Sequence, residues 1–225
     1  MIKKISVMGM ELDNYSNRES LSVIEGFLKD TAMNYVQMVN MELLILAESD
    51  ENVKNALSDA DLTIVGDKAI LEAAGAVRLQ RINETENGNF FVDFLKKLYR
   101  SGYGVYLVGD TQADIDSLEK FLSENFEHLR IMGSATLCDD ASEGEKLVND
   151  INIVLPDVII SAASSPRQEI FLNNHKSQIC AKLWYAAGAG KPHNRKTYGI
   201  RKFMRRVISS RIFHHRVNKF NNENL

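Results

Sequence analysis

Short apolar runs alternate with stretches of helical periodicity along most of the chain. The runs that predict β-strands lie at 35–39, 62–65, 104–108, 129–132, 157–161 and 182–187. The segments between them predict helices at 40–57, 66–76, 89–101, from Thr111 onward, at 143–152 and from a capped start at 164–166, with a proline in its first turn. Strands without polar alternation, separated by helices, are typical of a parallel sheet covered on both faces. We therefore predict an α/β fold with a Rossmann-like parallel sheet, preceded by a small separate hairpin at 5–12.

The composition fits a globular protein with its own core. The chain has 225 residues, of which 44% are hydrophobic and 25% charged. Its two cysteines argue against a disulfide scaffold and fit a reducing compartment. No apolar run approaches the ~20 residues of a membrane span, and the N-terminus lacks the apolar region of a secretory signal. We expect a cytoplasmic protein that meets any membrane from its surface.

The charge is distributed unevenly. Residues 1–190 carry a net charge of −12, whereas residues 191–225 carry +9. Such a split is typical of an acidic body with a basic tail that meets an anionic surface. We place a boundary near Gly190, with a Rossmann-like body at 1–190 and a basic C-terminal appendage at 191–225.

The appendage has the pattern of an amphipathic helix. Its apolar positions recur at helical spacing (Ile200, Phe203, Met204, Val207, Ile208 and Ile212), and basic residues fall on the other face (Arg201, Lys202, Arg205 and Arg206). Such a helix can lie in a membrane interface, pack on the body with its basic residues solvated, or contact nucleic-acid phosphates. No recognised nucleic-acid fold surrounds it, so we favour an anionic membrane surface and expect no nucleic acid.

Candidate chemistry lies just after the predicted strands, because ligands of open parallel sheets bind beyond the carboxyl ends of the strands. Five groups qualify: Asn40 with Glu42, Gly66 with Asp67, Gly109 with Asp110, Ser164 to Glu169, and Gly188 to Lys191. Asp67 could act as a general base on an acceptor hydroxyl, or could simply cap a helix. The histidines are not at metal-ligand spacing, and we expect no metal and no cofactor.

Two of these groups could bind phosphate. The helix start at Ser164–Glu169 offers free N–H groups, and Arg167 and Gln168 beside them could hold a diphosphate; plain helix capping is the alternative. The glycine loop with Gly188 and Gly190 resembles a phosphate loop without completing a known motif, and a tight turn is its alternative.

Several motifs, in order, resemble the WecG/TagA/CpsF glycosyltransferases over nearly the whole chain. They are residues 7–13 (VMGMELD), Asn40-x-Glu42, Ala60-Asp61-Leu62 with the following glycine-aspartate turn, residues 105–109 (VYLVG), residues 165–169 (SPRQE), the glycine-bearing end of the last strand, and the basic appendage. The SPRQE element is the most specific of these.

The resemblance implies an inverting transferase. Family members move a sugar, often of the N-acetylmannosamine type or a hexosyl unit, from a UDP-sugar to a lipid-diphosphate-linked acceptor in surface-polymer synthesis. The donor pocket would hold Arg167 and Gln168, with Gly188 near the phosphates, and Asn40 would line the sugar or acceptor side. Further substrate-binding candidates are Glu42, Gly109, Glu169 and Gly190.

The expected chemistry follows from this resemblance. Asp67 would take the proton of the acceptor hydroxyl. Arg205, Arg206 and Arg216 of the appendage would stabilise the leaving diphosphate and contact the inner face of the cell membrane as part of a peripheral membrane protein.

Two departures from the family pattern keep an alternative open. Met38-Val39 stands where the family has threonine and proline, and Gly66-Asp67 places the aspartate one position later than usual. The alternative is an inactive member that binds a nucleotide sugar or a partner enzyme as a regulator or scaffold. Oligomeric state is open as well, because the Phe90, Phe91 and Phe94 cluster could be core or interface, with core as the default.

Overall fold

The structure, a computed structural model, describes residues 3–76, 78–87, 90–137, 140–187 and 200–223, without the side chains of 87, 141 and 200–211. Eight strands occur in this part of the chain: β1 (Lys4–Val7), β2 (Met10–Asp13), β3 (Asn34–Val39), β4 (Leu62–Val65), β5 (Gly104–Gly109), β6 (Arg130–Thr136), β7 (Val158–Ser161) and β8 (Leu183–Ala186). The helices are α1 (Asn17–Phe27), α2 (Met41–Ala47), α3 (Glu51–Ser58), α4 (Lys68–Ala73), α5 (Leu79–Asn87), α6 (Phe90–Ser101), α7 (Gln112–Asn125), α8 (Ala141–Val154), α9 (Arg167–His175) and α10 (Ile200–Glu223).

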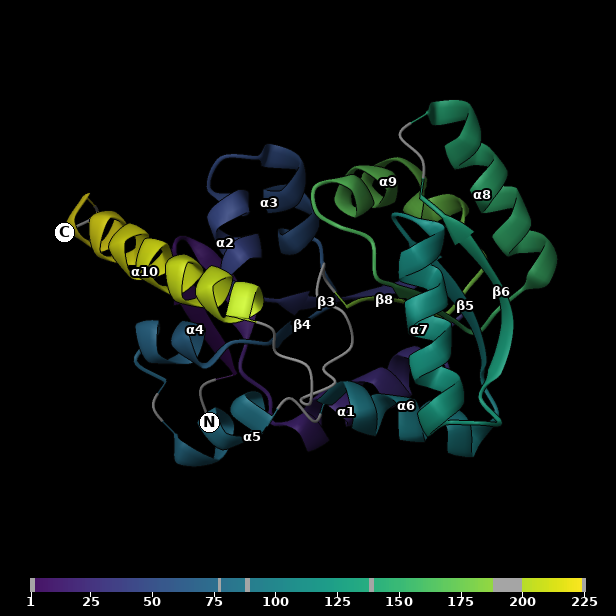
Figure 1. The fold of residues 1–225 in the computed structure, drawn as a ribbon, viewed down its shortest axis with the longest axis horizontal. Coiled ribbons are helices and arrows are strands. Elements are labelled where there is room, and N and C mark those ends of the chain that lie inside the picture. The colour runs from purple at the N-terminus through teal and green to yellow at the C-terminus, as the bar shows by residue number, and fades with distance from the viewer. Residues whose placement is uncertain (1–2, 77, 88–89, 138–139, 188–199, 224–225) are drawn as a thin grey trace.

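A six-stranded sheet organises the body in the order β4-β3-β8-β7-β5-β6. All of its neighbouring strands are parallel. Helices cover both faces, with α1 and α6 on one side and α3, α8 and α9 on the other (Figure 1). The predicted α/β class and Rossmann-like parallel sheet are therefore confirmed.

Consecutive residues of each strand point to opposite faces of the sheet. Tyr185 packs on the face of α1, α6 and α7, whereas its neighbour Trp184 packs on the face of α8 and α9. Phe90, Phe91 and Phe94 are buried against Tyr185, with ring centroids 4.8 to 6.2 Å from its ring. The default prediction that these phenylalanines belong to the core is confirmed.

The predicted N-terminal hairpin forms its own two-stranded sheet, β1-β2, apart from the main sheet. Gly9 adopts φ +74° in its turn, a left-handed conformation that glycine tolerates without strain. The buried carboxylate of Asp13 accepts hydrogen bonds from the Thr63 backbone N–H at 2.9 Å and from its hydroxyl at 3.1 Å. The hairpin is thereby fixed to β4, beside the carboxyl edge of the sheet.

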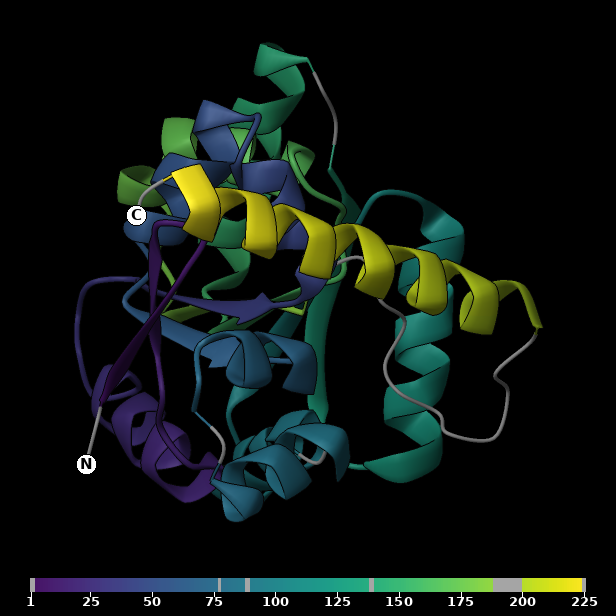
Figure 2. The same ribbon diagram turned by 90° about the vertical axis from the view of Figure 1, so that its left-hand side faces the viewer.

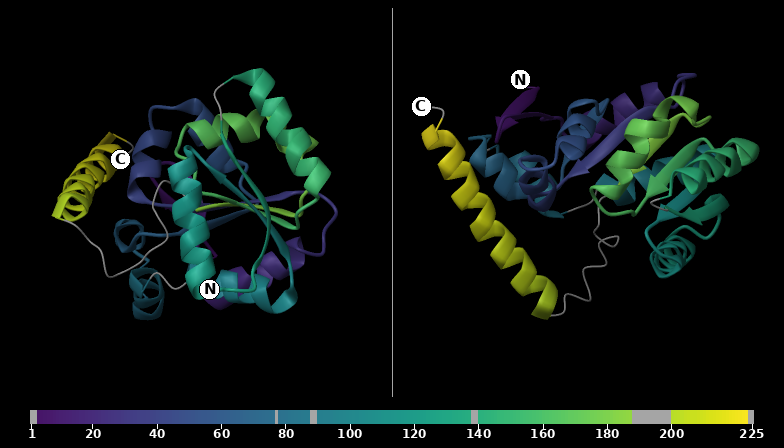
Figure 3. Two further views of the ribbon diagram at one scale, coloured as in Figure 1. Left: turned by 45° about the vertical axis from the view of Figure 1, so that its right-hand side comes forward. Right: turned by 90° about the horizontal axis from the view of Figure 1, so that it is seen from above.

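Among the side chains that the structure describes, those of the second half of helix α10 dock on the body. Phe213 and Val217 are buried in a cluster with residues of the hairpin, α2 and α4, and Arg216 pairs at 2.5 Å with Glu48, the residue after α2. The first half of the helix extends away from the body (Figures 2 and 3). The packed-helix alternative therefore applies to the second half of α10, whereas the basic side chains of the first half lie outside the described residues.

Three details differ from the sequence prediction. The helix expected at 40–57 is split in two: α2 ends at Ala47, and Asp50 caps a new helix, α3, by accepting hydrogen bonds from the N–H groups of Asn52 and Val53. Helices α1 and α5 were not predicted. The serines before Pro166 do not cap α9; the Ser165 hydroxyl instead donates to the Glu169 carboxylate at 2.7 Å, and Pro166 lies just outside the helix.

Candidate active site

Two of the predicted site residues, Asn40 and Asp67, lie side by side where β3 and β4 end. Asn40 caps α2, and its side-chain oxygen accepts a hydrogen bond from the Leu43 N–H at 2.8 Å. Asp67 does not cap its own helix. Its Oδ2 accepts instead from the Met41 N–H at 3.0 Å, in the first turn of α2. The two side chains are therefore held by the same helix start.

The second oxygen of Asp67, Oδ1, makes no hydrogen bond within the described residues, and the side chain is half-buried. One carboxylate oxygen thus fixes the group while the other stays available. This is the arrangement that a general base needs, because it must be oriented and still have a lone pair for the incoming proton.

Gly66 brings the two strand ends close together. Its N–H donates to the Val39 carbonyl at 2.7 Å. A Cβ at this position would lie 2.9 Å from Met38 Sδ and 3.2 Å from the Val39 carbonyl oxygen. Glycine therefore allows the close approach that sets Asp67 beside Asn40.

Asn40 and Asp67 are among the residues that line a cavity of about 140 Å³. Most of its walls are apolar and come from the sheet, α6 and α7; they include Met38, Ile64, Phe90, Phe91, Leu118, Phe121 and the ring of Tyr185. Two hydroxyl-bearing residues also line the cavity, Tyr185 of β8 and Thr85 of α5. The cavity is smaller than the ~300–1,000 Å³ of a complete small-molecule site, so it can hold only part of a substrate.

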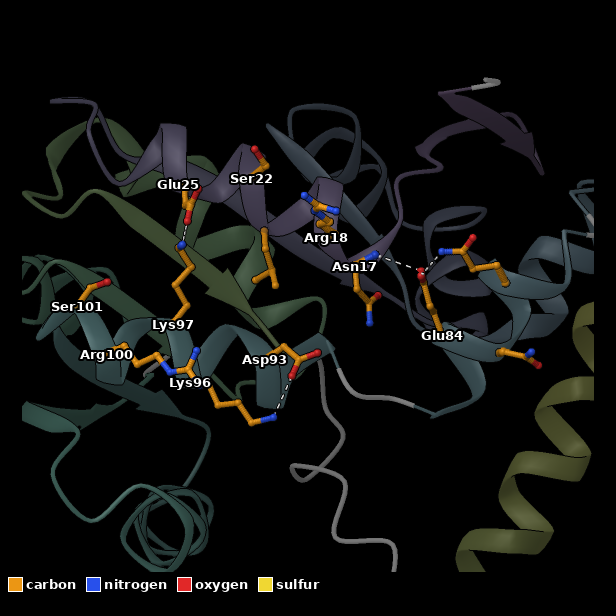
Figure 4. Close-up of a pocket in the computed structure, with 13 residues that line it drawn as sticks. Asn17, Arg18, Ser22, Glu25, Glu84, Asp93, Lys96, Lys97, Arg100 and Ser101 are labelled. Carbon is orange, nitrogen blue, oxygen red and sulfur yellow. Dashed lines mark hydrogen bonds and ion pairs between the residues drawn. The ribbon is translucent and has the colours of Figure 1, made fainter.

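A charged surface groove of about 1170 Å³ adjoins the cavity (Figure 4). Helices α1, α5 and α6 form it, and Asn17 and Glu84 line both spaces. The Glu84 carboxylate accepts hydrogen bonds from the Asn17 N–H at 3.1 Å and from Arg81 at 3.0 Å, which ties α5 to α1.

The groove can receive an anionic group. Four basic side chains line it, and two of them are paired, Lys96 with Asp93 at 3.1 Å and Lys97 with Glu25. Arg18 and Arg100 form no ion pair within the part of the chain that the structure describes. Their charges are left for solvent or a ligand.

The SPRQE element occupies a different place from the cavity. Gln168 and Glu169 are buried, and the Gln168 amide donates to the Glu169 carboxylate at 3.1 Å. They lie near Tyr35, whose pKa is raised by burial and, to a smaller extent, by the negative charge of Glu169. Tyr35 faces the α8 and α9 side of the sheet, opposite to the cavity. The structure therefore does not bring Gln168 or Glu169 to Asp67.

Arg167 and Arg216 are both engaged with carboxylates. Arg167 lies 3.5 Å from Asp110, whose other carboxylate oxygen accepts a hydrogen bond from the Ser164 N–H at 2.9 Å. Arg216 pairs with Glu48. Neither lines the cavity or the groove. If either arginine binds a diphosphate, the diphosphate must replace the carboxylate that now pairs with it or share the arginine with that carboxylate.

The remaining predicted residues divide into three kinds. Gly109 ends β5, and a Cβ there would lie 3.0 Å from Ile115, so its smallness serves the packing of α7. Glu42 is exposed on α2. Gly188, Gly190 and the side chains of Arg205 and Arg206 lie outside the described residues. Among the described residues, no cluster of histidine, cysteine, aspartate and glutamate could hold a metal ion.

Sequence reasoning missed Tyr185 and Thr85, and it named Gly66 without its packing role. Tyr185 lies inside an apolar strand and looks like any core residue, and Thr85 lies on a helix that has no clear periodicity. Gly66 did carry a signal, since a glycine directly before a candidate catalytic aspartate indicates a close backbone approach.

Comparison with known proteins adds a family and one relative. The model of a family described as "Glycosyl transferase WecG/TagA/CpsF family" matches residues 5–191. A Staphylococcus aureus (strain MRSA252) protein named N-acetylglucosaminyldiphosphoundecaprenol N-acetyl-beta-D-mannosaminyltransferase is 18% identical over 187 residues, which cover 82% of this chain and 73% of the relative. The matched region includes the cavity, the groove and the SPRQE element.

Proposed function

Because the chain belongs to the WecG/TagA/CpsF family of glycosyltransferases, we propose that it transfers an N-acetylmannosamine-type sugar from a UDP-sugar to a polyprenyl-diphosphate-linked amino sugar. The relative from Staphylococcus aureus carries such an activity in its name. The observation that carries the proposal is the Asp67 carboxylate, held by one oxygen and available at the other, in the lining of a cavity at the sheet's carboxyl edge.

The reaction balances with this chain's own groups. The acceptor hydroxyl oxygen attacks C1 of the donor sugar and forms the new glycosidic bond, while the bond from C1 to the UDP oxygen breaks. Asp67 Oδ1 takes the hydroxyl proton, and UDP leaves with the bonding electron pair, so the configuration at C1 is inverted. Arg205 and Arg206 would offset the charge on the departing diphosphate.

The decisive experiment measures sugar transfer by wild type and Asp67→Asn, with UDP-N-acetylmannosamine as donor and a short-chain prenyl-diphosphate N-acetylglucosamine as acceptor. The asparagine oxygen can still accept from the Met41 N–H, so the fold is kept while the basic oxygen is lost. We expect kcat to fall by about 10²–10⁴-fold.

The matched control is Asp59→Asn, at an exposed aspartate after α3, which should keep the wild-type rate. Full activity of Asp67→Asn would overturn the base assignment. Binding of the UDP-sugar without turnover by wild type, with any of several acceptors, would favour a regulator or scaffold instead.

We also propose that the basic first half of α10 contacts an anionic membrane. The sequence places Arg201, Lys202, Arg205 and Arg206 there, and this half extends from the body (Figure 3). Each basic residue near an anionic surface contributes about 1 kcal/mol. No helix within the described residues is both long and apolar enough to cross a bilayer.

Flotation with vesicles tests the membrane contact. We expect binding to phosphatidylglycerol vesicles and little to phosphatidylcholine vesicles, and weaker binding when Arg205 and Arg206 are both changed to glutamine. Equal flotation with both lipids would contradict the proposal. A mobility shift with nucleic acid at physiological salt would support the rival partner.

A further inference from the structure

Two buried hydroxyl groups line the cavity beside Asp67 without a partner. Tyr185 is fully buried and Thr85 is 9% exposed, and neither hydroxyl makes a hydrogen bond within the described residues. An unpaired buried hydroxyl is costly, whereas phenylalanine and valine would fill the same space without that cost. The two hydroxyls therefore indicate a ligand group that completes their hydrogen bonds.

The hydroxyl of Tyr185 is a fixed, neutral donor. The rings of Phe90, Phe91 and Phe94 pack around its ring, the closest with a centroid distance of 4.8 Å, and hold its orientation. Burial raises the pKa of the Tyr185 phenol well above its ordinary value, so the proton remains on the oxygen at any physiological pH. Such a donor fits a neutral carbonyl oxygen better than a second donor or a cation.

The rest of the cavity selects a small apolar group. Phe90, Phe91, Leu118 and Phe121 form much of its wall, and its volume is about 140 Å³. An apolar cavity of roughly 150 Å³ admits a benzene molecule, which has more heavy atoms than an acetamido group. A nucleoside or a whole sugar ring with its substituents needs more room than this.

We propose that this cavity is the subsite for the acyl group of a 2-acetamido sugar. The Tyr185 and Thr85 hydroxyls bind its carbonyl oxygen, and the phenylalanine rings enclose its methyl group. The inference rests on the proposed function, because the acyl group belongs to a sugar that reacts beside Asp67. Either the donor sugar or the acceptor sugar could carry this acyl group, so the binding test has one arm for the donor and one for the acceptor.

Calorimetry on the full chain measures the two arms without requiring turnover. The donor arm compares UDP-N-acetylmannosamine with UDP-mannose, and the acceptor arm compares farnesyl-diphosphate-linked N-acetylglucosamine with its glucose counterpart. We expect wild type to bind the acylated member at least about tenfold more tightly in one arm. Tyr185→Phe and Thr85→Val should each reduce that preference several-fold, toward equality, and leave the affinity for the non-acylated member unchanged.

The matched control is Tyr106→Phe, at a buried tyrosine on the opposite face of the sheet, which should keep the wild-type preference. Thermal unfolding checks the fold, and Tyr185→Phe should be no less stable than wild type because it removes an unpaired hydroxyl. Three results would overturn the acyl subsite. They are equal affinities for the acylated and non-acylated ligands in both arms, a preference that survives in both cavity variants, and no binding at all.

The outcomes separate this inference from the proposed activity. Turnover without any acyl preference would remove the subsite and leave the transferase intact. Acyl-dependent binding that is lost in Tyr185→Phe, without turnover under any acceptor, would support the subsite and remove the catalytic proposal.

Discussion

Replacement of Gly66 by alanine tests how Asp67, the proposed general base, is positioned. The added Cβ would lie 2.9 Å from Met38 Sδ and 3.2 Å from the Val39 carbonyl oxygen, so β3 and β4 must separate slightly at their ends. Overpacking of this kind costs about 1–3 kcal/mol. Alanine also restricts the unfolded chain, which returns about 0.4–1 kcal/mol. We therefore expect the free energy of unfolding to fall by about 1–2 kcal/mol.

Urea unfolding measures this loss as a lower midpoint at unchanged slope. The matched control is Gly26→Ala in α1, where nothing lies within 4 Å of the added Cβ. Alanine should stabilise that helix by about 0.5–1 kcal/mol. The two substitutions are chemically identical, so opposite signs would isolate the steric effect at Gly66.

The displacement should reach Asp67 as well, because the residue follows Gly66 directly. We expect kcat of Gly66→Ala to fall more than tenfold under conditions where the variant is fully folded. In the double variant Met38→Ala/Gly66→Ala, removal of the sulfur should make the losses of stability less than additive. An unchanged midpoint and an unchanged kcat in Gly66→Ala would refute the reasoning.

Three further predictions follow from other contacts. Phe213→Ala should empty a buried site, weaken the docking of α10 by about 3–5 kcal/mol and make this helix sensitive to limited proteolysis; resistance equal to wild type would contradict the packing. Arg216→Gln should cost at most about 1 kcal/mol of stability, since its partnership with Glu48 is partly exposed, so a fall in kcat at unchanged stability would identify a role at the diphosphate. Hydrogen bonds from the Ser16 backbone and hydroxyl lower the pKa of Glu19 from its ordinary 4.5, so its contribution to α1 is present above pH 4.5 and is lost as the pH falls through the lowered value. In a carboxyl NMR titration, Ser16→Ala should raise this pKa by the smaller share that comes from the hydroxyl, and an unchanged value would contradict that share.

Strands β4, β5, β7 and β8 could be predicted because each is a short apolar run in which every residue is buried. Helix α5 could not, because its support comes from distant residues. Lys68 of α4 pairs with Glu86 at 2.6 Å, and Glu84 accepts from the N–H of Asn17. Neither contact leaves a periodic pattern within residues 79–87, so local reasoning found no helix there.

Only part of the candidate site could be predicted from the sequence. Asn40 and Asp67 could be placed together because neighbouring parallel strands end at the same edge. Gln168 and Glu169 were expected to join them, but the face of the sheet onto which α9 packs depends on the whole topology. The cavity walls come from α5, α6, α7 and three strands, and no single segment of sequence records their meeting.

The position of β8 has a consequence for biosynthesis. This strand is the last of the sheet to leave the ribosome, yet it lies between β3 and β7 and joins the two halves. Until residues 183–186 emerge, the nascent polypeptide holds two half-sheets with open edges, which are prone to pair with other chains. Because Tyr185 belongs to that last strand, the proposed acyl subsite is completed only after β8 has emerged.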